Sequence, residues 1–206
     1  MAITIDYFFS PVSPWTYLGH QRFTEIAARY AARINLKPVD YGKVFPVSGG
    51  LPLKQRAPQR QAYRLVELRR FRDHLGVPLN LEPKFFPTPA EAASLFIIAT
   101  DQRHGAATAL ALAHAFMRAC WAEERNIGDD ATLVEICAGQ GIDPGELAVA
   151  DGRAKAAYDA YTQEAIDRQV FGAPTYILDN EAFWGQDRLE FVERALAKSS
   201  ARAAQS

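Results

Sequence analysis

Ser13 is the first candidate for a chemical role in this sequence, because it lies directly before Pro14 at the expected start of a helix. Leu18, Phe23 and Ile26 then recur at helical spacing, and proline suits the first position of a helix. A serine hydroxyl there can cap the helix. The same place also offers unpaired backbone N–H groups and the positive end of the helix dipole, which favour an anion. Ser13 is therefore predicted to be a helix cap, with an anion-holding role as the second interpretation.

A second candidate segment is FGAPT, residues 171–175, which precedes an expected strand. Pro174 at such a place can follow a cis peptide bond. That geometry would turn the N–H and C=O of Ala173 toward a ligand. Because a Gly-X-Pro pattern is also common in ordinary loops, both interpretations stay open.

The third candidate is WGQDR, residues 184–188, at an expected junction of strand and helix. Backbone N–H donors of this segment, together with Asp187, have the charges needed to hold an α-amino acid group. The carboxylate would take the donors and the ammonium would pair with Asp187. The alternative is that Asp187 simply caps the last helix.

The elements that must position these residues follow from the hydrophobic pattern. Residues 3–9 and 34–42 are rich in β-branched and aromatic side chains, so we expect two parallel strands joined by the helix that starts at Pro14. Residues 43–57 are rich in proline and glycine and predict a loop. Short strands at TYILD and AFWG, with a turn at Asp179-Asn180, predict an antiparallel hairpin. The expected helices are 58–76, 88–103, 105–126, 129–140, about 144–169 and 187–198.

This order predicts an α/β protein in which a helical insertion interrupts a βαβ…ββα core. We place the core at residues 1–43 and 170–206 and the insertion at 44–169. The five arginines of the segment 58–76 predict, for most of them, a solvated helix face. They are Arg60, Arg64, Arg69, Arg70 and Arg72.

Composition and charge argue against several classes of function. With 23 Lys and Arg against 24 Asp and Glu, the net charge of −1 gives no general attraction to nucleic acid or an anionic membrane. We expect a cytoplasmic protein, because neither a signal peptide nor a transmembrane run is evident. Cys120 and Cys137 have no CxxC partner and are expected to be buried. The four histidines lack the spacing of a metal site, so we expect none.

Together, SPWTYL after the first strand, FGAPTYIL before the third and WGQDRL before the last helix resemble a known arrangement. They look like the 2-hydroxychromene-2-carboxylate isomerases and the kappa-class glutathione transferases, in the DsbA-like branch of the thioredoxin superfamily. The likeness extends from residue 3 to about 198. It implies a thioredoxin-like core, glutathione as cofactor and a homodimer.

The resemblance also assigns roles. Ser13 would hold the thiol of glutathione as a thiolate, and glutathione would further contact Ala173, Pro174, Trp184, Gly185, Gln186 and Asp187. The role of the serine has a physical reason, because a free thiol has a pKa of about 8.5 and is mostly protonated at neutral pH. A hydroxyl donor at a helix terminus favours the thiolate and lowers that pKa. Since no cysteine lies near Ser13, dithiol chemistry is not expected there.

On the substrate side, the resemblance points to Lys43, Lys54 and Phe86. Either lysine could pair with a substrate carboxylate, and each could equally be a solvated surface residue. The sequence departs from the family pattern at Ser10, where relatives often have aspartate, and at Phe86, where a tyrosine is replaced. The implied activity is glutathione-dependent interconversion of 2-hydroxychromene-2-carboxylate and trans-o-hydroxybenzylidenepyruvate, an aromatic 2-oxo acid. The alternatives are a kappa-like glutathione transferase and a non-catalytic binding or chaperone module.

Overall fold

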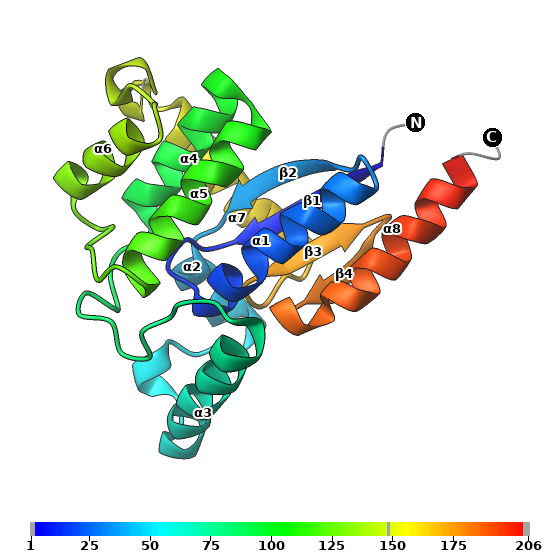
Figure 1. The fold of residues 1–206 in the computed structure, drawn as a ribbon, viewed down its shortest axis with the longest axis horizontal. Helices are drawn as coiled ribbons and strands as arrows, with labels where there is room; N and C mark the ends of the chain where they lie inside the picture. The colour runs from blue at the N-terminus through cyan, green and yellow to red at the C-terminus, as the bar shows by residue number, and fades with distance from the viewer. Residues whose placement is uncertain (1–2, 148, 204–206) are drawn as a thin grey trace.

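A four-stranded sheet with the order β2-β1-β3-β4 forms the centre of the computed structural model, which describes residues 3–147 and 149–203 (Figure 1). Strand β1 (Thr4–Phe9), helix α1 (Pro14–Arg29) and strand β2 (Arg33–Pro38) form a βαβ unit with parallel strands. Strand β3 (Thr175–Leu178) is antiparallel to β1 and pairs with β4 (Glu181–Trp184). The expected core is therefore confirmed.

The turn between β3 and β4 also matches the sequence. Asp179 and Asn180 have positive φ angles of 50° and 66°. Two successive left-handed residues suit a two-residue hairpin turn, and Asp and Asn tolerate that conformation better than most residues. The antiparallel hairpin expected from TYILD and AFWG is present.

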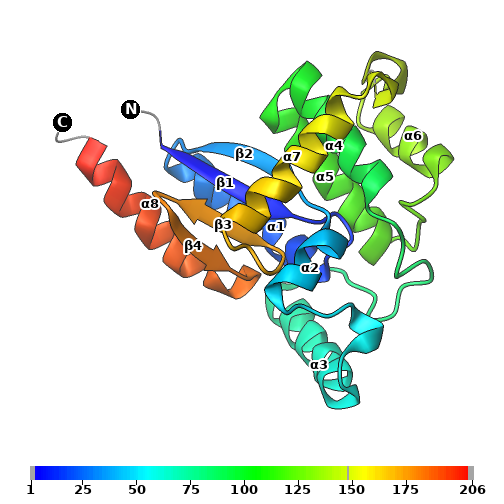
Figure 2. The same ribbon diagram turned by 180° about the vertical axis from the view of Figure 1, so that it is seen from behind.

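Helices cover both faces of the sheet. Helix α1 and the last helix, α8 (Leu189–Ala203), pack on one face (Figure 1). Helix α7 (Arg153–Asp167) and the short helix α2 (Tyr41–Ser48) cover the other face, as seen from behind in Figure 2. The alternation of side chains along β1 serves both layers, because Tyr7 joins the cluster on the α1 side and Phe8 the cluster on the α7 side.

The helical insertion lies between β2 and β3, as expected. Helix α3 (Pro58–Leu75) projects past the start of α1 (Figures 1 and 2). Helices α4 (Glu91–His104) and α5 (Ala106–Trp121) form a hairpin beside β2. Helix α6 (Asp130–Gly139) follows, and 3₁₀ turns lie at Leu53–Gln55, Pro144–Leu147, Val149–Asp151 and Gln186–Arg188.

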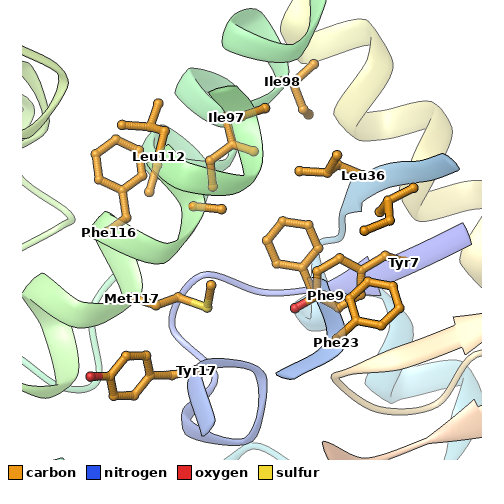
Figure 3. Packing of buried hydrophobic residues seen from close by; sticks show 14 of the residues in the cluster. Tyr7, Phe9, Tyr17, Phe23, Leu36, Ile97, Ile98, Leu112, Phe116 and Met117 are labelled. Carbon is orange, nitrogen blue, oxygen red and sulfur yellow. The ribbon is translucent and has the colours of Figure 1, made fainter. Parts of the chain in front are cut away.

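The insertion and the sheet share one apolar core. Figure 3 shows Tyr7 of β1 and Phe23 of α1 on one side, with Ile97 of α4 and Phe116 of α5 on the other. All four side chains have no solvent exposure. The helices between β2 and β3 are therefore packed onto the sheet. The division of the chain at residues 44 and 169 stays a prediction.

Several expected boundaries were wrong. The second strand ends at Pro38 rather than near residue 42, and the expected loop from residue 43 begins instead with helix α2. Asp40 caps α2 by accepting a hydrogen bond from the Gly42 N–H at 2.9 Å, and Gly49 ends the helix in a left-handed conformation. The helix holds despite Pro46 inside it, because Tyr41 and Val44 are buried beneath it.

The other differences are at helix ends. The segment expected to be helical from about residue 144 starts with two 3₁₀ turns, and α7 begins only at Arg153. The expected helix 105–126 ends at Trp121. Among residues 3–147 and 149–203, no helix has the length and apolarity required to cross a bilayer.

Candidate active site

Ser13 lies in the loop between β1 and α1 and is the N-cap of α1. Its Oγ accepts a hydrogen bond from the backbone N–H of Thr16 at 3.2 Å, and Pro14 occupies the first helical position. The predicted capping role is therefore confirmed. Since a hydroxyl has one proton to donate besides its two acceptor sites, the cap leaves the proton of Ser13 free for a ligand. The side chain is half-buried and lines a cavity at this end of the sheet.

The loop before β3 brings Ala173 to the same cavity. The Ala173-Pro174 peptide bond is cis, which is one of the two interpretations that the sequence left open. The carbonyl oxygen of Gly172 accepts hydrogen bonds from the Tyr41 hydroxyl at 3.0 Å and from Thr175 Oγ1 at 2.7 Å. These two contacts fix the loop from both sides. Tyr41 has no place in the sequence prediction, because residues 41–42 were expected to continue a strand.

The segment from Trp184 to Asp187 lies directly beside Ala173. Its backbone is tied to the loop, since the Gly185 N–H donates to the Pro174 carbonyl at 2.9 Å. Gly185 has a φ of 101°, a conformation that favours glycine. Gln186 is buried, and its Oε1 accepts a hydrogen bond from Arg22 of α1 at 2.9 Å. The three predicted segments therefore meet at one place.

Asp187 presents an exposed carboxylate. Arg188 Nη1 lies 2.6 Å from its Oδ2. Helix α8 begins only at Leu189, after a 3₁₀ turn that contains Asp187. The carboxylate remains accessible to a ligand ammonium from the cavity that it lines.

Two adjoining cavities occupy this end of the molecule. The first has a volume of about 560 Å³ and contains Ser13, and the second has about 520 Å³ and contains Gly185 to Arg188. Trp15, Ala173 and Trp184 belong to the walls of both. The first cavity is strongly aromatic, lined by Trp15, Tyr41, Phe45, Phe86, Phe171 and Trp184. The arrangement suits an extended polar ligand in the second cavity and an aromatic ligand in the first.

The three residues predicted to contact substrate have different positions. Phe86 lines the first cavity and packs against Trp121, with ring centroids 4.7 Å apart. Lys43 points to the surface, where its Nζ lies 3.0 Å from Asp159 Oδ1. Lys54 lies exposed in the 3₁₀ turn Leu53–Gln55. Among the described residues, the side chains that line either cavity include neither lysine.

Arginines of the helical insertion supply the positive charge of these cavities instead. Arg56, Arg60 and Arg64 line both. The solvated face was predicted for most of the five arginines, and Arg64 is an exception that lines the cavities half-buried. Burial, followed by the charge of Arg56, lowers the pKa of its guanidinium to about 10. The spacing of Arg60 and Arg64 by four residues is the sequence signal that could have placed these two on one side of helix α3, whereas Arg56 precedes the helix.

Neither cysteine belongs to this site. Burial raises the pKa of Cys120 to about 12 and that of Cys137 to about 11. Both thiols are therefore protonated at neutral pH and shielded from reagents. In the part of the chain that the structure describes, no cluster of three or more histidine, cysteine or acidic residues could hold a metal ion.

Comparison with known proteins identifies the family. Residues 4–197 match the model of the DSBA-like thioredoxin domain. The chain belongs to this family. A 2-hydroxychromene-2-carboxylate isomerase of Pseudomonas putida is 29% identical over 199 residues, which cover 94% of each chain. The structure of a 2-hydroxychromene-2-carboxylate isomerase superposes with a TM-score of 0.80 at 27% identity and covers 98% of each chain.

A further relative is the human glutathione S-transferase kappa 1, which is 21% identical over 95% of this chain and 91% of its own length. The family expected from the three motifs is therefore confirmed. The two cysteines of the sequence, Cys120 and Cys137, are both buried and neither lines the cavity that contains Ser13.

Proposed function

We propose that this protein is a glutathione-dependent isomerase that interconverts 2-hydroxychromene-2-carboxylate and trans-o-hydroxybenzylidenepyruvate. The observation that carries the proposal is the position of Ser13, whose hydroxyl lines an aromatic cavity at the N-terminus of α1. The similarity to isomerases over nearly the whole chain supports the same activity.

The residues present suit glutathione. Asp187 offers a carboxylate for its ammonium group, and the backbone N–H groups of Gln186 and Asp187 in the same turn are the candidate donors for its α-carboxylate. Ala173, shared by the two cavities, lies where an extended peptide would cross from one to the other. We therefore propose that Ala173, Pro174, Trp184, Gly185, Gln186 and Asp187 bind the peptide and that Ser13 receives its sulfur.

The chemistry that glutathione supplies when bound is reversible nucleophilic addition of its thiolate to a conjugated carbon. The task of Ser13 is to keep the sulfur ionised. Its free hydroxyl proton and the positive end of α1 both favour a negative charge beside them, so the pKa of the thiol falls. Because the hydroxyl is not itself a redox group, the site stabilises a thiolate without exchanging disulfides.

The aromatic wall of the first cavity would bind the aromatic acid substrate. Phe86, Trp15 and Phe171 present apolar faces to this space. A planar aromatic acid would pack on these rings and lose its contact with water. Such packing orients the conjugated carbon relative to Ser13, and orientation alone contributes strongly to rate.

The test is turnover with less glutathione than substrate. Incubation with 2-hydroxychromene-2-carboxylate should convert more substrate than the glutathione present, while the amount of free glutathione stays constant. Ser13→Ala should abolish most of this turnover. Ser200→Ala, on α8 and outside both cavities, is the matched control and should keep it.

Two other results would redirect the assignment. Loss of glutathione in proportion to substrate would identify a transferase, the activity named for the human kappa relative. Absence of glutathione binding at millimolar concentration would favour a binding module. A homodimer, implied by the family resemblance, and the cytoplasmic location expected from the sequence also belong to the proposal, and sedimentation of the purified protein tests the dimer.

A further inference from the structure

Arg64 is a half-buried cation in the wall that the two cavities share, and it forms no salt bridge with the described residues. Its Nη2 is buried and has no hydrogen-bond partner among the described residues. Glu67, one helical turn further along α3, forms an ion pair with Arg70 at 2.5 Å. Burying an unpaired charge is costly, and a buried donor without a partner calls for an explanation.

The surroundings of Arg64 add positive charge. Arg56 and Arg60 line the same two cavities, and Arg56 Nε is engaged with the backbone carbonyl of Leu51 at 2.8 Å. None of the described side chains that line the first cavity is acidic. Burial lowers the pKa of Arg64 only to about 10, so the guanidinium is still protonated at neutral pH. The first cavity therefore presents a positive charge that the protein itself leaves unbalanced.

Aromatic rings hold Arg64 in place. The centre of its guanidinium lies 5.3 Å from the ring centroid of Phe86 and 5.7 Å from that of Trp121. Stacking of this kind restrains the planar group and leaves its edge free to form paired hydrogen bonds. Two parallel N–H donors match the two oxygens of a carboxylate. The nearby Phe86 and Trp15 provide the surface on which an attached aromatic ring would lie.

We propose that Arg64 binds the carboxylate of the aromatic substrate in the cavity that contains Ser13 and thereby selects aromatic acids over neutral aromatic compounds. This inference rests on the proposed function and names the residue that recognises the substrate. It assigns to Arg64 the role that the family resemblance suggested for Lys43 or Lys54, neither of which lines the cavities.

A pair of matched ligands tests the inference without turnover. Trans-cinnamate and its neutral amide have nearly the same shape, and their dissociation constants can be measured by calorimetry on the protein with glutathione present. The wild-type protein should bind the acid roughly 10- to 100-fold more tightly than the amide, the range expected for a hydrogen-bonded charge pair. In Arg64→Met this preference should fall to near unity.

Two further variants complete the design. Arg69→Met changes an exposed arginine of the same helix outside both cavities and should keep the preference. Arg64→Lys retains the charge but loses the paired donors, so it should keep part of the preference. It also provides a folded comparison if Arg64→Met is unstable, and thermal unfolding of each variant monitors this.

An unchanged acid preference in both Arg64 variants would overturn the inference, as would a wild-type protein that binds neither ligand or does not prefer the acid. The outcome is separable from that of the proposed function. If the wild-type protein prefers the acid through Arg64 but does not isomerise 2-hydroxychromene-2-carboxylate, carboxylate recognition stands and the isomerase assignment fails.

Discussion

Ser13 combines a helix cap with a donor for sulfur, and two substitutions separate these roles. Ser13→Ala removes both the bond to the Thr16 N–H and the hydroxyl proton. It should lower the free energy of unfolding by about 1 kcal/mol. Ser13→Gly should lower it by only a few tenths of a kcal/mol, because glycine is tolerated as an N-cap. Both variants lack the hydroxyl, so their effects on the bound thiol should be equal.

The size of that effect follows from the charge on the sulfur. A hydrogen bond to a charged group contributes about 1.5–3 kcal/mol, and one pKa unit corresponds to about 1.4 kcal/mol. The pKa of the bound glutathione thiol should therefore rise by about 1–2 units in both variants. Turnover at neutral pH should fall with the ionised fraction, by roughly 5- to 100-fold, and should recover as the pH is raised through the new pKa.

The assay is the ultraviolet absorbance of the thiolate, recorded against pH for the complex of each protein with glutathione. Denaturant unfolding without glutathione reports the cap separately. The reasoning is refuted if the bound thiol has the same pKa in the wild-type protein and in Ser13→Gly. Equal loss of stability in Ser13→Ala and Ser13→Gly would refute the capping argument alone.

Three other predictions follow from the structure. Lys43→Ala should leave the KM for the aromatic acid unchanged, because the ammonium is engaged in a surface ion pair outside the cavities; steady-state kinetics decides this. Cys120 and Cys137 should resist a thiol reagent at neutral pH until the chain unfolds, since burial raises both pKa values; labelling before and after denaturant measures it. Burial lowers the pKa of His20 to about 3 in the folded protein. As the pH falls below about 6.5, His20 is therefore protonated in the unfolded chain but still neutral in the folded one. Stability should then decline by up to about 1.4 kcal/mol per pH unit, and His20→Gln should reduce this slope in urea titrations.

The sheet could be predicted because its signals are local. A stretch of only a few residues is enough to predict the strand β1, the cap at Ser13 and the turn at Asp179 and Asn180. Helix α2 could not, because its proline and glycines resemble those of a loop. It forms because Tyr41 and Val44 find a buried place beside α7, which depends on residues more than a hundred positions away.

The proposed glutathione side of the site could be predicted in the same way, since its three segments carry compact motifs. The charge on the substrate side was not. Whether an arginine of α3 faces water or a cavity depends on where the whole helix lies relative to α1 and to the loop around Phe86. The sequence shows five arginines of similar appearance, and only the packing distinguishes Arg64 from Arg69.

The order of the elements along the chain also has a consequence for synthesis. Ser13 leaves the ribosome early, together with β1, but Ala173 and β3 emerge only near the end. At translation rates of about 5–20 residues per second, the delay is on the order of ten to thirty seconds. During that time one edge of β1 has no strand beside it, and such an edge can pair with other chains. A nascent or truncated chain therefore has the helix cap but neither the loop at Ala173 nor a complete sheet, so the proposed site can form only with the last sixth of the polypeptide.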